Sequence, residues 1–212
     1  MKIGPDYRCE HVLADGTRVV LRPIRPEDAP ALREAFGHLS ADSRYRRFFG
    51  AVSALDDATL AYLTNVDGVD HFAVVAGIES PDLKAERGIG VARFVRLHDE
   101  PDVAEPAVTV IDEMQNKGVA RILLATLADA AIERGIRHFR GEALATNEPV
   151  RALLAEGGAV LRREAGGTIV FDIALGPTSD AAPASSPTLA RFLREAASSM
   201  AFFVRNLRPP SA

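Results

Sequence analysis

The residue types and spacing best suited to chemistry lie in the segment Val108–Arg121, which reads VTVIDEMQNKGVAR. Its apolar, β-branched start is typical of a strand, and a helix is predicted to begin at Val119. The first amides of a helix have no partner within it and stand in front of about half a positive charge. Because Gly118 and Ala120 place no bulky side chain there, a diphosphate can approach these amides. Two neighbouring side chains add cationic donors: Lys117 and Arg121.

A second interpretation of this segment stays open at this point. A plain strand-to-helix turn would also contain Gly118, which would then only ease the bend. Cys9 is the single cysteine and has no Cys or His at metal-ligand spacing, so we expect neither an internal disulfide nor a metal site. The five histidines form no constellation in the sequence, and we assign them no role.

Hydrophobic patterns typical of strands and of helices occur on both sides of this segment. Strands are predicted at residues 17–22, 71–77, 88–95, 104–111, 138–144, 160–164 and 168–174. Helices are predicted from residue 25 and at residues 42–48, 56–63, 119–134 and 148–156. Pro106 indicates a bulge or an unpaired position in its strand, because proline cannot donate a ladder hydrogen bond. This order predicts an α/β fold in which helices cover both faces of a mixed, mostly antiparallel sheet.

Composition divides the chain into a domain and a tail. We expect an N-terminal extension over residues 1–16, a domain over 17–175, an Ala/Ser/Pro linker over 176–187 and an amphipathic helix over 188–208. That helix is expected to pack on its own domain or on a second copy in a homodimer, and a membrane surface is the less favoured alternative. The net charge of -4 argues against nucleic-acid binding, and no signal peptide is evident, so we expect a cytoplasmic protein.

Three segments of the chain resemble one known family. Gln115–Ala120 is similar to the coenzyme A signature of the GNAT superfamily of N-acetyltransferases, Gln/Arg-x-x-Gly-x-Gly/Ala between a strand and a helix. Arg22–Gly50 and Ala143–Gly158 resemble the bacterial Pat-type protein-lysine acetyltransferases. The likeness extends over residues 17–174 and implies the GNAT fold, in which the two strands that flank the Val119 helix splay apart.

The resemblance implies acetyl-coenzyme A (acetyl-CoA) as the co-substrate, no metal, and a set of binding residues. The main chain of Val108, Thr109 and Val110 would pair with the pantetheine arm like an added strand, next to a bulge that splays the sheet. Asn147 would hydrogen-bond the cofactor and could also cap the following helix. The signature residue Gln115 is followed by the residues whose backbone would hold the diphosphate: Asn116, Lys117, Gly118, Val119, Ala120 and Arg121.

The chain departs from the family pattern at positions that bear on catalysis. Asn116 replaces a common glycine, which is tolerable because Asn accepts unusual backbone angles. Leu153–Leu154 occupies the region where many relatives carry a tyrosine general acid. We therefore expect direct attack of an amine on the thioester with Glu105 as the base, at the position that the Pat-type pattern fills with glutamate. Glu142 is the reserve candidate, and an amide near Val110 is expected to stabilise the oxyanion.

Three functions stay open on these grounds. The first is acetylation of a primary amine, a protein lysine being favoured. The second is acetylation of a small amine such as a polyamine or an antibiotic. The third is a sensor or scaffold that binds acetyl-CoA without turnover, which the missing tyrosine and Pro106, in place of the usual valine, would favour. The acceptor side carries no sequence code that separates them.

Overall fold

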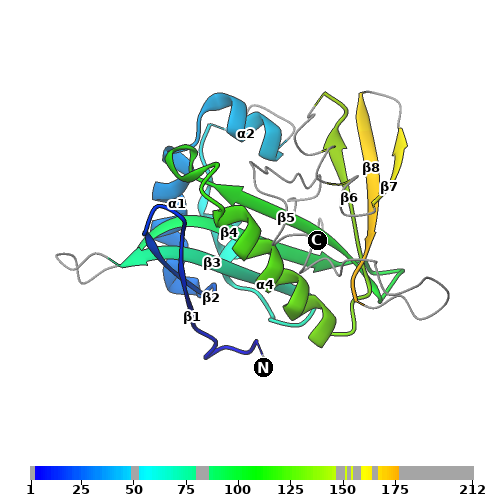
Figure 1. Ribbon diagram of the computed structural model, residues 1–212, viewed down its shortest axis with the longest axis horizontal. Coiled ribbons are helices and arrows are strands. Elements are labelled where there is room, and N and C mark those ends of the chain that lie inside the picture. Colours follow the sequence, from blue (N-terminus) through cyan, green and yellow to red (C-terminus); the bar gives the residue numbers. More distant parts are fainter. Residues whose placement is uncertain are drawn as a thin grey trace.

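The sheet is the central element of the molecule. The computed structural model describes residues 3–48, 53–79, 86–146, 151, 154, 159–163 and 167–176. These residues form an eight-stranded sheet in the order β1-β2-β3-β4-β5-β6-β8-β7 (Figure 1). The strands are β1 Cys9–Val12, β2 Arg18–Pro23, β3 His71–Glu79, β4 Glu86–Arg96, β5 Val103–Val110, β6 His138–Leu144, β7 Val160–Arg163 and β8 Thr168–Ala174. Every neighbouring pair is antiparallel except β5 and β6, so the prediction of a mixed, mostly antiparallel sheet is confirmed.

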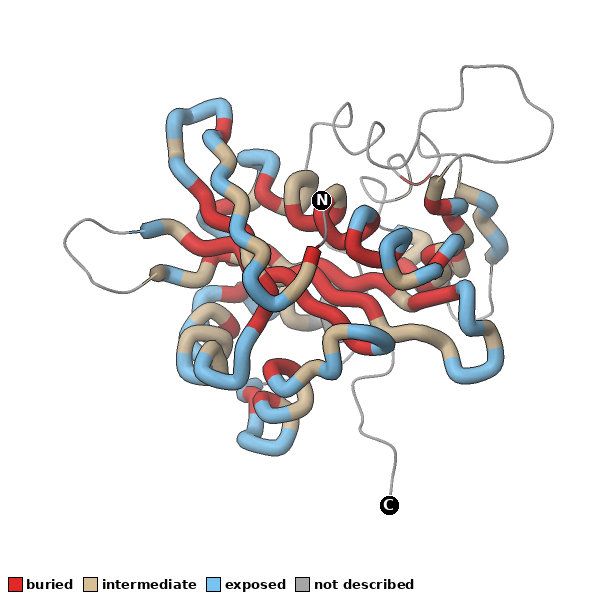
Figure 2. Tube along the Cα trace, turned by 90° about the horizontal axis from the view of Figure 1, so that it is seen from below, coloured by how far each residue is buried: buried red, intermediate tan, exposed pale blue. Residues whose placement is uncertain are grey.

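Helices cover both faces of this sheet, as the sequence predicts. The helices are α1 Ala29–Gly37, α2 Ala41–Phe48, α3 Asp57–Thr64 and α4 Val119–Glu133, and the 3-10 turns are η1 Pro26–Asp28 and η2 Asp112–Met114. α4 packs on one face, where Leu123 reaches β4 at Gly90. α1 and α3 pack together on the other face in a separate apolar cluster. Buried residues concentrate in the central strands and exposed ones in the connecting turns (Figure 2).

Residues 1–16, which we expect from the sequence to be an N-terminal extension, contribute a strand to the sheet. β1 pairs with β2 from Cys9 opposite Leu21 to Val12 opposite Arg18. Ile3 also belongs to the main apolar core. β1 is an edge strand of four residues, none of them fully buried, so its sequence carries no hydrophobic alternation that would predict it.

Several predicted elements fall outside the described residues. These are the linker after Gly176, the amphipathic helix at 188–208, and most of the helix at 148–156, of which only Arg151 and Leu154 are described, as helical. The packing of the tail helix on the domain or on a second copy therefore stays a prediction. None of the helices given above combines the length and apolar composition that a bilayer crossing requires.

Candidate functional site

The two parallel strands at the middle of the sheet are paired only at their starts. Val103 lies opposite His138 and Ala104 opposite Phe139, and no further pair joins β5 to β6 in the described part of the chain. Beyond these pairs β5 continues along β4 and β6 continues along β8. The two strands therefore diverge toward their carboxyl ends and leave one edge of each without a strand neighbour (Figure 1). This is the splay that the family resemblance implies.

The ladder between β4 and β5 decides which way each residue of β5 presents its main-chain groups. At one end the Ile111 N–H donates to the Ile89 carbonyl at 3.0 Å, so residue 111 faces β4. At the other end the Leu97 N–H donates to the Val103 carbonyl at 2.9 Å, so residue 103 also faces β4. Facing alternates along a strand, and Thr109 therefore also faces β4. The residues that turn their main-chain groups toward the opening are Pro106, Val108 and Val110.

The direction of these main-chain groups corrects the expectation that Thr109 pairs with the pantetheine arm. It also decides whether Pro106 marks a bulge or an unpaired position. Thr109 uses its main chain on β4, so it cannot pair with an added strand as Val108 and Val110 can. The register from Gly90–Arg96 to β5 has no shift, and the bulge expected in this strand is absent. The register shift lies one ladder away, between β3 and β4. Pro106 instead takes the unpaired position, because it faces the opening and costs β4 no hydrogen bond.

The first turn of α4 lies directly after this edge and has no side-chain cap. Its N-cap is Gly118, with φ 91°, and the earliest helical bond runs from the Arg121 N–H to the Gly118 carbonyl at 3.1 Å. The amides of Val119 and Ala120 precede that bond and point out of the helix. Apart from its two chain neighbours, a Cβ placed on Gly118 would meet no atom of the described residues within 4 Å, so the space beside this turn is open among them. Asn116 has φ 61°, so this residue, which replaces a glycine common in the family, adopts the left-handed conformation that asparagine tolerates. The site fits an anionic group.

The side chain of the signature glutamine, Gln115, stabilises this turn through hydrogen bonds. Its Nε2 donates to the Val110 carbonyl at 3.2 Å and to Asp112 Oδ1 at 3.1 Å. Asp112 also accepts from the Ser40 N–H at 3.1 Å and the Ser43 hydroxyl at 2.8 Å, which ties the start of α2 to the same turn. Partial burial raises the pKa of Asp112, but the bonds from the two serines outweigh it and lower that pKa overall. Gln115 therefore fixes the loop geometry through its side chain.

The two candidate bases lie on either side of the opening. Glu105 is partly buried, lies opposite Val95, and follows the last residue that pairs with β6. Glu142 is partly buried on β6. Side chains alternate along a strand, and opposite partners share a face, so both carboxylates belong to the face that carries α1. Two other expected positions, Asn147 and Leu153, lie outside the described residues.

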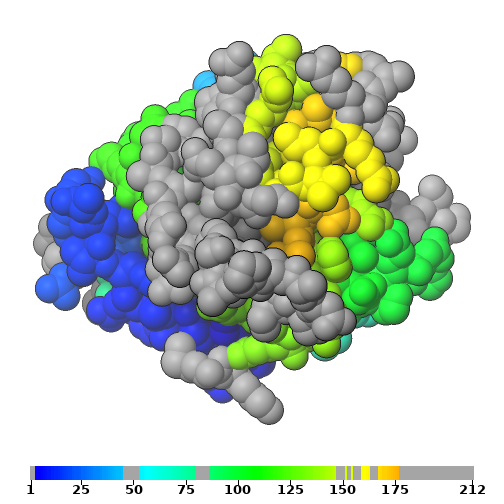
Figure 3. Space-filling view, turned by 45° about the vertical axis from the view of Figure 1, so that its right-hand side comes forward, coloured from blue at the N-terminus to red at the C-terminus, as the bar shows by residue number. Residues whose placement is uncertain are grey.

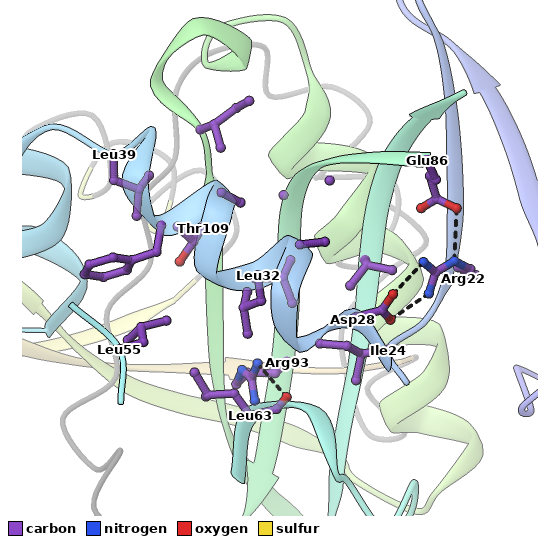
Figure 4. Close-up of a pocket in the computed structure, with 18 residues that line it drawn as sticks. Arg22, Ile24, Asp28, Leu32, Leu39, Leu55, Leu63, Glu86, Arg93 and Thr109 are labelled. Atoms are coloured by element: carbon purple, nitrogen blue, oxygen red, sulfur yellow. Dashed lines mark hydrogen bonds and ion pairs between the residues drawn. The ribbon is translucent and has the colours of Figure 1, made fainter. Parts of the chain in front are cut away.

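A cavity of about 90 Å³ on the α1 face is not evident from the sequence. It lies between α1 and strands β2–β5, and its walls are mostly apolar (Figure 4). At one end Arg22 makes two bonds of 2.8 Å to Asp28 and one of 3.0 Å to Glu86. Burial raises the pKa of Asp28, but the Arg22 bonds outweigh burial and lower it overall. Thr109 lines the same cavity with its side chain.

Two histidines have partners that sequence spacing does not indicate. His71 Nε2 lies 2.9 Å from a guanidinium nitrogen of buried Arg93, which also donates to the Leu63 carbonyl at 3.1 Å. Burial, and then the Arg93 charge, lower the pKa of His71 to about 4. His138 Nδ1 lies 2.8 Å from Asp172 on the β6–β8 side of the sheet, where Figure 3 shows β7 and β8 at the surface.

The comparisons with known proteins agree with this geometry. Residues 18–160 match the sequence model of the acetyltransferase (GNAT) domain, and the chain belongs to this family. The fold is the GNAT fold, and the protein is an acetyltransferase.

Two relatives and one solved domain are similar to this chain over most of its length. It is 32% identical to an acetyltransferase of Pseudomonas aeruginosa, over 72% of this chain and 80% of that protein. It is 33% identical to the acetyltransferase Pat of Mycolicibacterium smegmatis, over 74% of this chain but only 46% of that longer protein. The solved GNAT domain of S. lividans PAT superposes with a TM-score of 0.71 at 31% identity, covering 79% of this chain and 97% of that domain.

Proposed function

We propose that this acetyltransferase takes its acetyl group from acetyl-CoA, which binds across the opening between β5 and β6 with its diphosphate at the start of α4. The observation that carries the proposal is that two incomplete main-chain structures, a strand edge and a helix N-terminus, follow one another in the chain. The β5 edge lacks a strand neighbour in the described residues, and the α4 N-terminus lacks a side-chain cap. An extended amide chain that ends in a diphosphate complements both. The solved structure of yncA from Salmonella typhimurium, which has the same fold at 19% identity and a TM-score of 0.57, holds its cofactor acetyl-CoA.

Each binding residue has a role in this proposal that follows from its main chain. Val110 offers its N–H group, and Val108 its carbonyl, to the amides of the pantetheine arm, and the Val108 N–H faces the thioester end of that arm. The amides of the first α4 turn, Val119 and Ala120, receive the diphosphate. Asn147 completes the set as the family resemblance implies. The remaining residues of the loop shape the backbone and supply charge: Gln115, Asn116, Lys117, Gly118 and Arg121.

The acceptor that we propose is a lysine side chain of a protein. The likeness to proteins named Pat, at 33% and 31% identity, supports this class. A lysine ammonium has a pKa of about 10.4, so its neutral form at pH 7 costs roughly 4.6 kcal/mol. A carboxylate held beside the ammonium offsets part of this cost by accepting its proton, which leaves the nitrogen lone pair free to form the N–C bond.

Glu105 is the base in this proposal because of where it lies. It follows directly after Ala104, at the point where β5 leaves β6, so its carboxylate is beside the narrow end of the opening. It takes the proton from the lysine ammonium, and the Val108 N–H, which lies on the open edge nearer to Glu105 than the Val110 N–H does, stabilises the oxyanion that forms on the thioester carbonyl. The thioester C–S bond then breaks, and coenzyme A leaves.

Thiol release from acetyl-CoA, measured with a lysine-rich protein and with a panel of small amines, tests the proposal. Glu105→Gln is expected to lower kcat by about 100-fold or more at pH 7 while the Kd for acetyl-CoA stays within about twofold. Glu142→Gln is the matched control, since it removes a partly buried carboxylate from the other side of the opening.

The results separate the alternatives. Full turnover in Glu105→Gln with loss in Glu142→Gln would transfer the role of base to Glu142. Turnover with small amines alone would replace the protein acceptor by a small one. Tight acetyl-CoA binding without thiol release under any acceptor would indicate a sensor or scaffold.

A further inference from the structure

The turn between β1 and β2 carries a carboxylate beside the proposed diphosphate loop. Asp15 Oδ2 lies 3.2 Å from Lys117 Nζ, and each side chain is about two-fifths exposed. This contact joins the edge of the sheet to the residue directly before Gly118. Asp15 also lies outside residues 18–160, the part of the chain that matches the family. It is therefore a feature of this chain that the family match does not supply.

The carboxylate is held in place by its own turn. Asp15 Oδ1 accepts the Thr17 N–H at 3.0 Å, and Gly16 turns the chain with φ 85°. Hydrogen bonds from Thr17, and then from Lys117, lower the pKa of Asp15 to about 2. Asp15 is thus negatively charged at every pH at which the protein is expected to work, and its charge stays next to Lys117.

We propose that Asp15 is a counter-charge that weakens the binding of the anionic diphosphate of coenzyme A and of its acetyl form. The inference rests on the proposed function, which puts the diphosphate at the start of α4. Asp15 acts in two ways that have the same sign. It occupies the ammonium of Lys117, and its own negative charge repels an anion that approaches the same loop. Weaker binding also favours release of coenzyme A after transfer.

A supporting role for Asp15 at Lys117 predicts a change in Kd of the opposite sign. If Asp15 served to hold Lys117 in a phosphate-binding position, removal of its charge would weaken cofactor binding. Exposure and screening limit either effect, because pairs at the surface contribute little and salt weakens them. The sign of the change is therefore the informative quantity.

Titration calorimetry with coenzyme A on the full chain tests the inference. Asp15→Asn keeps an oxygen for the Thr17 N–H and loses only the charge. We expect its Kd to fall about two- to fivefold at low ionic strength, and the gain to vanish near 0.5 M salt. In a Lys117→Met background the same change should give a smaller gain, because only direct repulsion is left. Dephospho-coenzyme A, which keeps the diphosphate, should show the same gain.

Asp57→Asn is the matched control. Asp57 is an exposed carboxylate that also pairs with a cation, Arg33, but it lies on the α1–α3 side, away from the proposed diphosphate loop. Its Kd should stay unchanged. An unchanged or higher Kd in Asp15→Asn, with native melting behaviour, would overturn this inference and leave the proposed function standing. Loss of the gain with dephospho-coenzyme A would overturn the assignment to the diphosphate. If the wild-type chain binds no coenzyme A, both the proposed function and this inference fail.

Discussion

The opening between β5 and β6 and the cavity on the α1 face both involve residues of β5, but they depend on different kinds of chemical group. At the opening, main-chain groups of Val108 and Val110 and the first amides of α4 carry the chemistry, and side chains mainly shape the loop. At the cavity, the polar groups are side chains already joined to one another, as Arg22 is to Asp28 and Glu86. A main-chain site is sensitive to backbone angles and to added Cβ atoms. A side-chain network is sensitive to charge, and therefore to pH.

The largest effect that separates the two regions is expected from His71, beside the cavity residue Arg93. Its pKa of about 4 in the folded protein lies below the 6.5 of an unperturbed imidazole. Between these values the unfolded chain binds a proton and the folded one does not, so stability falls as the pH drops from 6.5 to 4. The loss should reach about 3 kcal/mol.

Urea unfolding from pH 7.5 to 4.5 measures this loss, and His71→Gln is the control. Glutamine keeps an acceptor for Arg93 and cannot be protonated in this range, so the variant should lack most of the slope. Carboxylates with lowered pKa, Asp28 among them, act below this window. A wild-type free energy of unfolding that is flat between pH 7 and 4.5 would contradict the role given to His71.

A smaller effect, on binding, is expected at the start of α4. Gly118 and Gly135 have φ 91° and 79° and lie at the two ends of this helix, and beyond their chain neighbours the described residues place no atom within 4 Å of a Cβ added at either position. Alanine at either position should cost about 1 kcal/mol of stability through backbone strain. Only Gly118→Ala should also raise the Kd for coenzyme A, by about tenfold, because its Cβ lies before the anion-binding amides. Equal Kd values in both variants, by calorimetry, would remove the site from this end of the helix.

The sequence predicts the parts of the fold that local patterns specify. The bounds of β6 agree with the prediction, and α4 begins at Val119 as expected, because a long periodic stripe and a stop at Gly135 define it. The position of the helix start, and hence of the anion-binding amides, is readable for the same reason. Main-chain direction is also partly readable, since Pro106 marks a position without a ladder bond.

Features that depend on distant pairs were not predictable in this way. Arg22 and Glu86 are 64 residues apart, and His138 and Asp172 are 34 apart, so spacing gives no sign of either contact. The facing of Thr109 follows from the phase of the β4–β5 ladder, which a single strand sequence does not specify. β1 carries too little apolar pattern to be recognised before its partner strand is known.

Amide hydrogen exchange along β5, followed by NMR with and without coenzyme A, tests the central claim most directly. We expect the N–H groups of Val108 and Val110 to exchange at least about tenfold more slowly when coenzyme A is bound. The Thr109 N–H, already directed at β4, should be protected in both states. If Val108 and Val110 exchange at the same rate with saturating coenzyme A as without it, the cofactor does not bind along this edge.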